Sequence, residues 1–186
     1  MEIQRDEYAL IKECVDGNAE AYAVLVDRYK DMIYNIAYRM LGDADTAHDM
    51  AQESFISAYA GLKKFKNDSK FSTWLYSIAV NKCRDHLRGK RPHVPIDEIA
   101  EVACSAANPE EGLQSRQMLD GIQNALNALP DNYREAIILK HIEGLDYKEM
   151  GTIIGIDAGT LKVRTHRGRE MLKKLLKGTG VFDGQR

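Results

Sequence analysis

Apolar residues recur every three or four positions along almost every strongly patterned stretch of this sequence, which is the spacing of a helix face. The longest example covers residues 19–41, where one face collects Tyr22, Leu25, Val26, Tyr29, Ile33, Ile36 and Ala37. No stretch alternates convincingly with period two, as a half-buried strand would. The pattern therefore predicts an all-α fold.

Glycine, proline and aspartate divide this pattern into separate helices. In the first half we expect helices over residues 8–15, 19–41, 44–60 and 71–88. Asp43 is a candidate N-cap, a polar loop follows at 61–70, and Gly89 with Pro92 should end the fourth helix. In the second half we expect helices over residues 113–129 and 132–142, separated by Pro130 and closed by Gly144.

The composition changes between the two helical halves. Residues 92–112 contain three prolines and five acidic residues but no lysine or arginine. Such a segment is typical of a flexible linker. We therefore expect two domains, residues 1–91 and 113–178, joined by the acidic linker 92–112 and followed by a tail at 179–186.

The formal net charge of -2 conceals a local basic stretch. Residues 66–91 carry two acidic and seven basic side chains, and acidic segments lie on both sides of them. This sorting predicts local contact with nucleic acid, in a chain that does not adhere to all nucleic acid.

The residues give no support for catalysis or metal binding. The three cysteines are odd in number and widely spaced, and no two histidines have the spacing of metal ligands. No nucleophile elbow or phosphate-binding loop is present. No apolar run approaches the roughly 20 residues of a membrane span. We expect a cytoplasmic protein that is not an enzyme, with no catalytic residue, metal site, cofactor or small-molecule substrate.

Residues 145–176 have the layout of a helix-turn-helix, in which two helices are joined by a tight turn that contains glycine. Asp146 and Glu149 form an aspartate version of the capping box for the first helix. We expect the first helix to end at Gly155 and Asp157 to cap the second helix. A helix-turn-helix predicts DNA binding.

The second of these helices separates into an apolar and a basic face. Val163 lies in the middle of the basic face. Exposure to water does not stabilise an apolar side chain, whereas packing on a thymine methyl group in the major groove would. Lys162 and His166 could reach base edges, whereas the other basic residues would hold phosphates. An ordinary solvated face is the alternative. The candidate DNA contacts are Thr160, Lys162, Val163, Arg164, His166, Arg167, Lys173 and Lys174.

Three segments resemble a known family. DMAQESFISAY at residues 49–59 and FSTWLYSIAVN at 71–81 resemble region two of the extracytoplasmic-function sigma factors. GTLKVRTHRGRE at 159–170 is similar to their region-four recognition helix. The likeness covers nearly the whole chain, in the right order. It implies a region-two bundle and a region-four helix-turn-helix, in an alternative sigma factor that binds core RNA polymerase, recognises minus-ten and minus-thirty-five elements and helps to melt DNA.

The resemblance also implies protein partners. In the family, the outward face of the helix at residues 44–60 binds the clamp helices of the largest polymerase subunit. In this sequence that face presents Asp45, Asp49, Gln52, Glu53 and Ile56. A face that is merely soluble is the alternative. The family further implies contact with the polymerase flap and an anti-sigma factor that hides both domains.

For the minus-ten element, the family places a flipped base in the loop at 61–70, which here offers Phe65, Asn67, Asp68 and Ser69. Asn81 resembles the family's minus-ten contact, and one face of its helix repeats as Asn81, Arg84, Asp85 and Arg88. The spacing of Trp74 with its apolar neighbours favours core packing over base stacking. Gly151 and Gly168 stand where the family more often has alanine.

Two other classes compete with this interpretation. A free-standing helix-turn-helix regulator with a sensing domain would dimerise and hold a ligand pocket, whereas a sigma factor would be monomeric with an acidic docking face. An enzyme is the weaker alternative, because no residue cluster supports it.

Overall fold

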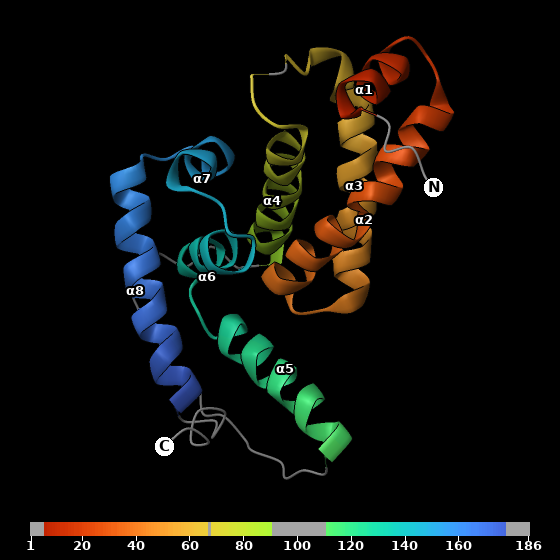
Figure 1. Ribbon diagram of the computed structural model, residues 1–186. Helices are drawn as coiled ribbons and strands as arrows, with labels where there is room; N and C mark the ends of the chain where they lie inside the picture. Colours follow the sequence, from red (N-terminus) through yellow and green to blue (C-terminus); the bar gives the residue numbers. More distant parts are fainter. Residues whose placement is uncertain (1–5, 67, 91–110, 178–186) are drawn as a thin grey trace. The chain divides into compact units, whose positions relative to one another are not determined.

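The computed structural model describes residues 6–66, 68–90 and 111–177, and every regular element in these ranges is a helix (Figure 1). The predicted all-α fold is confirmed. The chain forms two compact units, Met1–Tyr38 with Asp43–His86 and Arg39–Gly42 with Leu87–Arg186. None of the helices in the described ranges is both long and apolar enough to span a membrane.

The first unit is built from α1 (Glu7–Val15), most of α2 (Ala19–Leu41), α3 (Ala44–Gly61), the short 3-10 helix η1 (Leu62–Lys64) and most of α4 (Phe71–Lys90). Side chains that return every three or four residues form its core. The fully buried large ones are Leu10, Leu25, Ile33, Ile36 and Leu75.

Small residues let α3 pack closely within this unit. Ala47, Ala51 and Ala58 are buried, and so is Ser54, whose hydroxyl donates a hydrogen bond to the Met50 carbonyl at 2.6 Å. That bond satisfies the hydroxyl and allows a polar residue into the core. The sequence pattern did not indicate Ser54, because a serine on a helix is usually exposed. The predicted cap is confirmed, since the Asp43 carboxylate accepts from the Thr46 amide at 2.8 Å.

Two predicted boundaries in this half differ from the structure. The loop at 61–70 is shorter than expected, because α3 continues to Gly61 and η1 follows, with Leu62 buried. The prediction that Gly89 ends the fourth helix is wrong, because α4 runs through Gly89 to Lys90. A glycine inside a helix costs only about 1 kcal/mol, which neighbouring residues can offset.

The second unit contains α5 (Glu111–Asn127), α6 (Asp131–Ile137), the π-helical turn η2 (Ile138–Ile142), α7 (Tyr147–Ile154) and α8 (Ala158–Lys177). Helix α5 begins two residues before the predicted start at 113 and ends two residues before the predicted end at 129. The predicted helix at 132–142 is α6 together with η2. Residues 92–110 of the predicted linker and the whole tail lie outside the described ranges.

Helix α8 packs against α6, and Gly168 makes the close approach possible. A Cβ atom at Gly168 would lie 2.9 Å from the Ile137 side chain and 3.2 Å from the Tyr133 carbonyl oxygen. Real Cβ atoms rarely come so close to other atoms, so a larger residue would push the helices apart. The Ile137, Met150 and Leu161 side chains are buried in the core of this unit.

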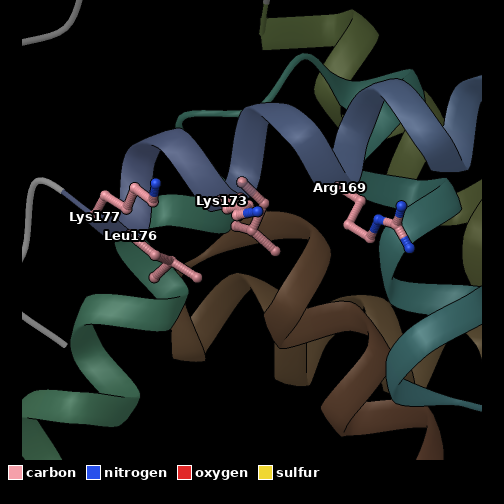
Figure 2. Close-up of a pocket in the computed structure, with 5 residues that line it drawn as sticks. Arg169, Lys173, Leu176 and Lys177 are labelled. Atoms are coloured by element: carbon pink, nitrogen blue, oxygen red, sulfur yellow. The ribbon is translucent and has the colours of Figure 1, made fainter. Parts of the chain in front are cut away.

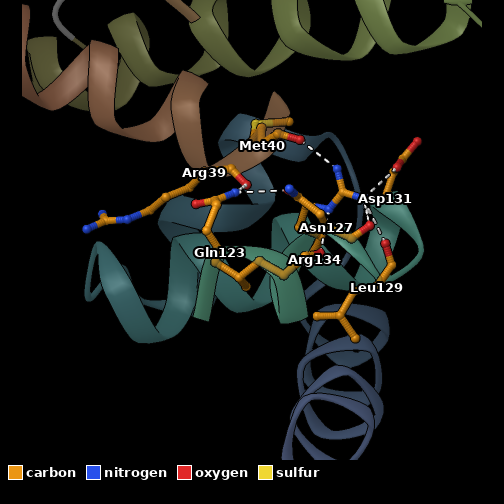
Figure 3. A network of polar contacts seen from close by, with 8 residues as sticks. Arg39, Met40, Gln123, Asn127, Leu129, Asp131 and Arg134 are labelled. Carbon is orange, nitrogen blue, oxygen red and sulfur yellow. Dashed lines mark hydrogen bonds and ion pairs between the residues drawn. The ribbon is translucent and has the colours of Figure 1, made fainter. Parts of the chain in front are cut away.

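Arg134 of α6 fixes the corner between α5 and α6 (Figure 3). Its buried guanidinium donates to four carbonyl oxygens, those of Met40 at 2.6 Å, Leu126 at 2.8 Å, Asn127 at 2.7 Å and Leu129 at 3.0 Å. Asp131 lies 3.6 Å from the same group. The carbonyls at the end of α5 have no partner within that helix, so the arginine both caps it and places positive charge at its negative pole.

Candidate nucleic-acid and protein-binding surfaces

Helices α7 and α8 form the predicted helix-turn-helix. Asp146 accepts hydrogen bonds from the Lys148 and Glu149 amides, both at 2.8 Å, while the Glu149 carboxylate accepts from the Asp146 amide at 3.1 Å. Gly155 then takes a left-handed conformation with φ of 79°. Asp157 accepts from the Thr160 amide at 2.9 Å. The capping box, the glycine turn and the second cap are therefore confirmed.

The two capping carboxylates are held in their charged form. A backbone hydrogen bond from Glu149, assisted by Lys148, lowers the pKa of Asp146 below its ordinary value. The pKa of Asp157 is lowered first by the Thr160 hydroxyl and then by the Thr160 amide. Both helices therefore begin with a negative charge at neutral pH, which suits the positive pole of each helix.

The outer face of α8 carries the candidate DNA contacts. Leu161, Thr165 and Gly168 are buried against the rest of the unit. On the opposite side Val163 is 51% exposed, although it is apolar. Arg164 is half-buried. The other predicted contacts are exposed: Thr160, Lys162, His166, Arg167, Lys173 and Lys174. The predicted separation of α8 into a buried and an exposed face is confirmed.

Tyr147, at the start of α7, lies beside this face and was missed at the level of sequence. Its ring centroid is 5.9 Å from the Lys162 ammonium of α8 and 4.9 Å from that of Lys140 in η2. Lys140 was not among the residues predicted from the sequence either. The three residues come from three separate elements, so no local sequence signal brings them together.

Helix α3 presents an exposed face that combines acidic, amide and apolar groups. All the predicted docking residues lie on it: Asp45, Asp49, Gln52, Glu53 and Ile56. Ile56 is 70% exposed. Glu53 pairs with Lys82 of α4 at 3.1 Å, and this pair is open to solvent. An exposed ion pair stabilises a fold by at most about 1 kcal/mol, so Glu53 can exchange this partner for another at little cost.

The candidate minus-ten residues lie between α3 and α4 and along α4. Phe65 is half-buried, with its ring centroid 5.1 Å from that of Trp74 and 5.7 Å from that of Phe71. Trp74 thus packs in an aromatic cluster, as the spacing favoured. Asp68, Asn81, Asp85 and Arg88 are exposed, Ser69 and Arg84 are half-buried, and Asn67 lies outside the described residues.

The carboxyl-terminal half of α8 borders a hollow of about 380 Å³ (Figure 2). Leu172 and Leu176 give it an apolar lining, and three cations surround them: Arg169, Lys173 and Lys177. Lys173, a candidate phosphate contact, therefore borders both this hollow and the exposed basic face. Among the described residues, no group of His, Cys, Asp or Glu side chains is placed to hold a metal ion.

Comparison with known proteins shows the family of this chain. The family described as Sigma-70 region 2 matches residues 25–93, and that described as Sigma-70, region 4 matches residues 119–172. The ECF RNA polymerase sigma factor SigW of Bacillus subtilis (strain 168) is 42% identical over 177 residues, which cover 90% of this chain and 95% of the relative. The chain belongs to the ECF sigma factor family. It is thus an alternative sigma factor for transcription initiation, and the competing regulator and enzyme interpretations are set aside.

Other relatives of this sigma factor also match it over most of their length. The RNA polymerase sigma-H factor of Pseudomonas aeruginosa is 34% identical, covering 93% of this chain and 95% of the relative. Among solved structures, CnrH in complex with the cytosolic domain of CnrY has a TM-score of 0.69 at 26% identity, covering 91% of this chain and 96% of that one. RpoE in complex with the anti-sigma factor NepR from Bartonella quintana has a TM-score of 0.66 at 25% identity, covering 86% and 98%.

The two family matches include most of the candidate residues of the sigma factor. The region 2 match includes the α3 face and all the minus-ten candidates. The region 4 match includes the helix-turn-helix but ends at residue 172, just before Lys173 and Lys174.

Proposed function

We propose that this sigma factor binds core RNA polymerase, recognises minus-ten and minus-thirty-five promoter elements and helps to melt DNA without a catalytic step of its own. We assign polymerase docking and minus-ten recognition to residues 1–91 and minus-thirty-five recognition to residues 113–178, with 92–112 as the linker. One observation carries the proposal: a single chain holds an exposed basic face with Val163 at its centre and, on another unit, an exposed acidic face around Ile56.

The α3 face is the proposed docking surface for the polymerase clamp helices. Its carboxylates would attract a basic partner, and Ile56 would supply apolar area to bury. Apolar surface removed from water contributes about 25 cal/mol per Å², so one isoleucine gives useful affinity. Asp45, Asp49, Gln52 and Glu53 surround Ile56 and would set the orientation of the partner.

Minus-ten recognition is proposed for the segment after η1 and for the exposed side of α4. Unstacking one base costs a few kcal/mol, so a pocket with polar edges must offset it. Asp68 and Ser69, with Asn67, would offer these edges, and Phe65 beside Trp74 would give an apolar wall. Asn81, Arg84, Asp85 and Arg88 would contact the strand that continues from the flipped base.

Minus-thirty-five recognition is proposed for the outer face of α8 in the major groove. Val163 would pack on a thymine methyl group, with Lys162 and His166 at base edges. Thr160, Arg164, Arg167, Lys173 and Lys174 would hold phosphates and set the register.

An anti-sigma factor is the proposed regulator. Support comes from the solved structure of a similar sigma factor in complex with the anti-sigma factor NepR. The apolar hollow rimmed by Arg169, Lys173 and Lys177 would suit a partner helix with acidic and apolar residues. The polymerase flap is a second proposed partner for the region 4 unit.

The docking proposal is tested by replacing Ile56 with aspartate and measuring the affinity for core polymerase. We expect Ile56→Asp to weaken binding at least tenfold, because it removes apolar contact area and adds a buried charge. Val24→Asp is the matched control, since Val24 is also an exposed apolar residue of the first unit. If both variants bind core polymerase as tightly as the unaltered chain, the α3 face is not the docking surface.

A further inference from the structure

The Tyr147 ring has two lysines near it that come from different elements. The Lys140 ammonium of η2 is 4.9 Å from the ring centroid, and the Lys162 ammonium of α8 is 5.9 Å from it. A cation within about 6 Å of an aromatic ring is attracted to its electron-rich face. The ring is half-buried, so it keeps a fixed position at the start of α7.

The two lysines differ in their other contacts. The Lys140 ammonium also donates to the Leu145 carbonyl at 2.9 Å, which ties it to the turn before α7. For Lys162, within the described part of the chain, the Tyr147 ring is the partner that the structure provides. Lys162 stands next to the exposed Val163 on the outer face of α8.

A lysine side chain is flexible, and fixing it at a DNA contact has an entropic cost of up to about 2 kcal/mol. A ring that already restricts the ammonium removes part of this cost before DNA arrives. We propose that Tyr147 is a positioning residue, whose ring holds the Lys162 ammonium in place for its contact with minus-thirty-five DNA. The inference rests on the proposed role of α8 as the reader of that element.

A role for the Tyr147 hydroxyl is the alternative, since a phenol can donate to a DNA phosphate. Two substitutions separate the possibilities. Tyr147→Phe keeps the ring and removes the hydroxyl, whereas Tyr147→Leu removes both. Each variant is assembled with core polymerase, and promoter affinity is measured in the unaltered and Lys162→Ala backgrounds.

We expect Tyr147→Leu to weaken promoter binding about two- to fivefold, which is the range of an exposed cation–π contact. Tyr147→Phe should stay within about twofold of the unaltered chain. In the Lys162→Ala background, Tyr147→Leu should have no further effect. An equal loss in the Phe and Leu variants, or a further loss in the Lys162→Ala background, overturns the inference.

Nuclear magnetic resonance on the unaltered chain gives a second readout that needs no substitution. The ε-protons of Lys162 should be shifted upfield by the ring, relative to those of the exposed Lys174. Equal shifts for the two lysines would overturn the inference, even if Tyr147→Leu does not fold.

The inference and the proposed function fail in different ways. If Lys162→Ala weakens promoter binding but Tyr147→Leu does not, the positioning role alone is wrong. If Lys162→Ala leaves promoter binding unchanged in an assembled holoenzyme, the proposed DNA contact of Lys162 is wrong, and the positioning role falls with it.

Discussion

Gly168 stands where α8 meets α6, and its lack of a side chain sets how closely the two helices pack. From the sequence it looks like a cost, because alanine favours a helix by about 1 kcal/mol over glycine. The contacts reverse this view, since a Cβ atom would lie 2.9 Å from Ile137 and 3.2 Å from a backbone oxygen. A backbone atom cannot move aside as a side-chain tip can.

We therefore expect Gly168→Ala to destabilise the second unit by about 1–3 kcal/mol, measured by urea denaturation followed by circular dichroism. Gly89→Ala is the control, because a Cβ atom at that α4 glycine would have no neighbour within 4 Å. The control should be neutral or gain up to about 1 kcal/mol. Equal stabilisation by both substitutions would show that the α6–α8 contact is looser than described.

Val163 and Arg167 test base reading and phosphate contact separately on the exposed face of α8. Val163→Ala in the holoenzyme should lose discrimination at one promoter base pair, by about 1–3 kcal/mol. Arg167→Ala should weaken all sequences alike and lower the slope of log affinity against log salt by about one. Binding to a promoter library at several salt concentrations measures both. A uniform loss for Val163→Ala would contradict its assignment as a base contact.

Among the elements, the junction of α5 and α6 depends on one buried guanidinium. Arg134→Met keeps much of the side-chain volume but removes the hydrogen bonds that the guanidinium donates to the carbonyls of Met40, Leu126, Asn127 and Leu129. We expect a loss of about 2–4 kcal/mol in the free energy of unfolding. Arg164→Met on the outer face of α8 is the control and should change stability by less than about 0.5 kcal/mol. A loss no larger than the control's would mean that solvent satisfies those carbonyls.

The caps of α7 and α8 should respond to acid. The folded pKa of Asp157 lies below the ordinary value of 3.8, so the unfolded state takes up the proton more readily. The stabilisation by this cap is therefore present above about pH 3.8 and is lost as the pH falls through the folded pKa. The Thr160 amide proton shift should titrate with a midpoint below 3.8. Asp157→Asn should abolish this titration, and a midpoint above 3.8 would contradict the assignment.

Sequence reasoning succeeded where a signal is local and failed where it depends on packing. Asp43, Asp146, Gly155 and Asp157 were predicted because a cap or a left-handed turn needs particular residue types at fixed positions. The extension of α4 through Gly89 could not be predicted, because neighbouring residues decide whether a glycine stays helical.

The same limit applies to the candidate sites. The exposed faces of α3 and α8 follow from helix periodicity alone. The burial of Ser54, the aromatic partners of Phe65 and the place of Tyr147 beside Lys162 depend on how separate elements pack. The DNA role of the α8 face was predicted from its helix-turn-helix layout, whereas the partner of the α3 face came from the resemblance to a family, since exposure does not name a partner.

In the complete sigma factor, each unit has only a modest DNA-binding surface of its own. The basic face on α8 and the minus-ten candidates of α4 would each bind DNA weakly, because only a few cations face each duplex or strand. Polymerase would bring both surfaces to one promoter, where a high effective concentration makes the combined affinity far greater than that of either surface alone. We therefore expect the free chain to give no tight sequence-specific gel shift on promoter DNA at physiological salt.

The direct test of the proposed function is transcription in vitro with purified core polymerase and a promoter library. We expect initiation that needs both the chain and the core enzyme, at promoters sharing one minus-thirty-five and one minus-ten sequence. A folded chain that fails to associate with core polymerase, or that binds such promoters equally tightly without it, would show that the proposed function is wrong.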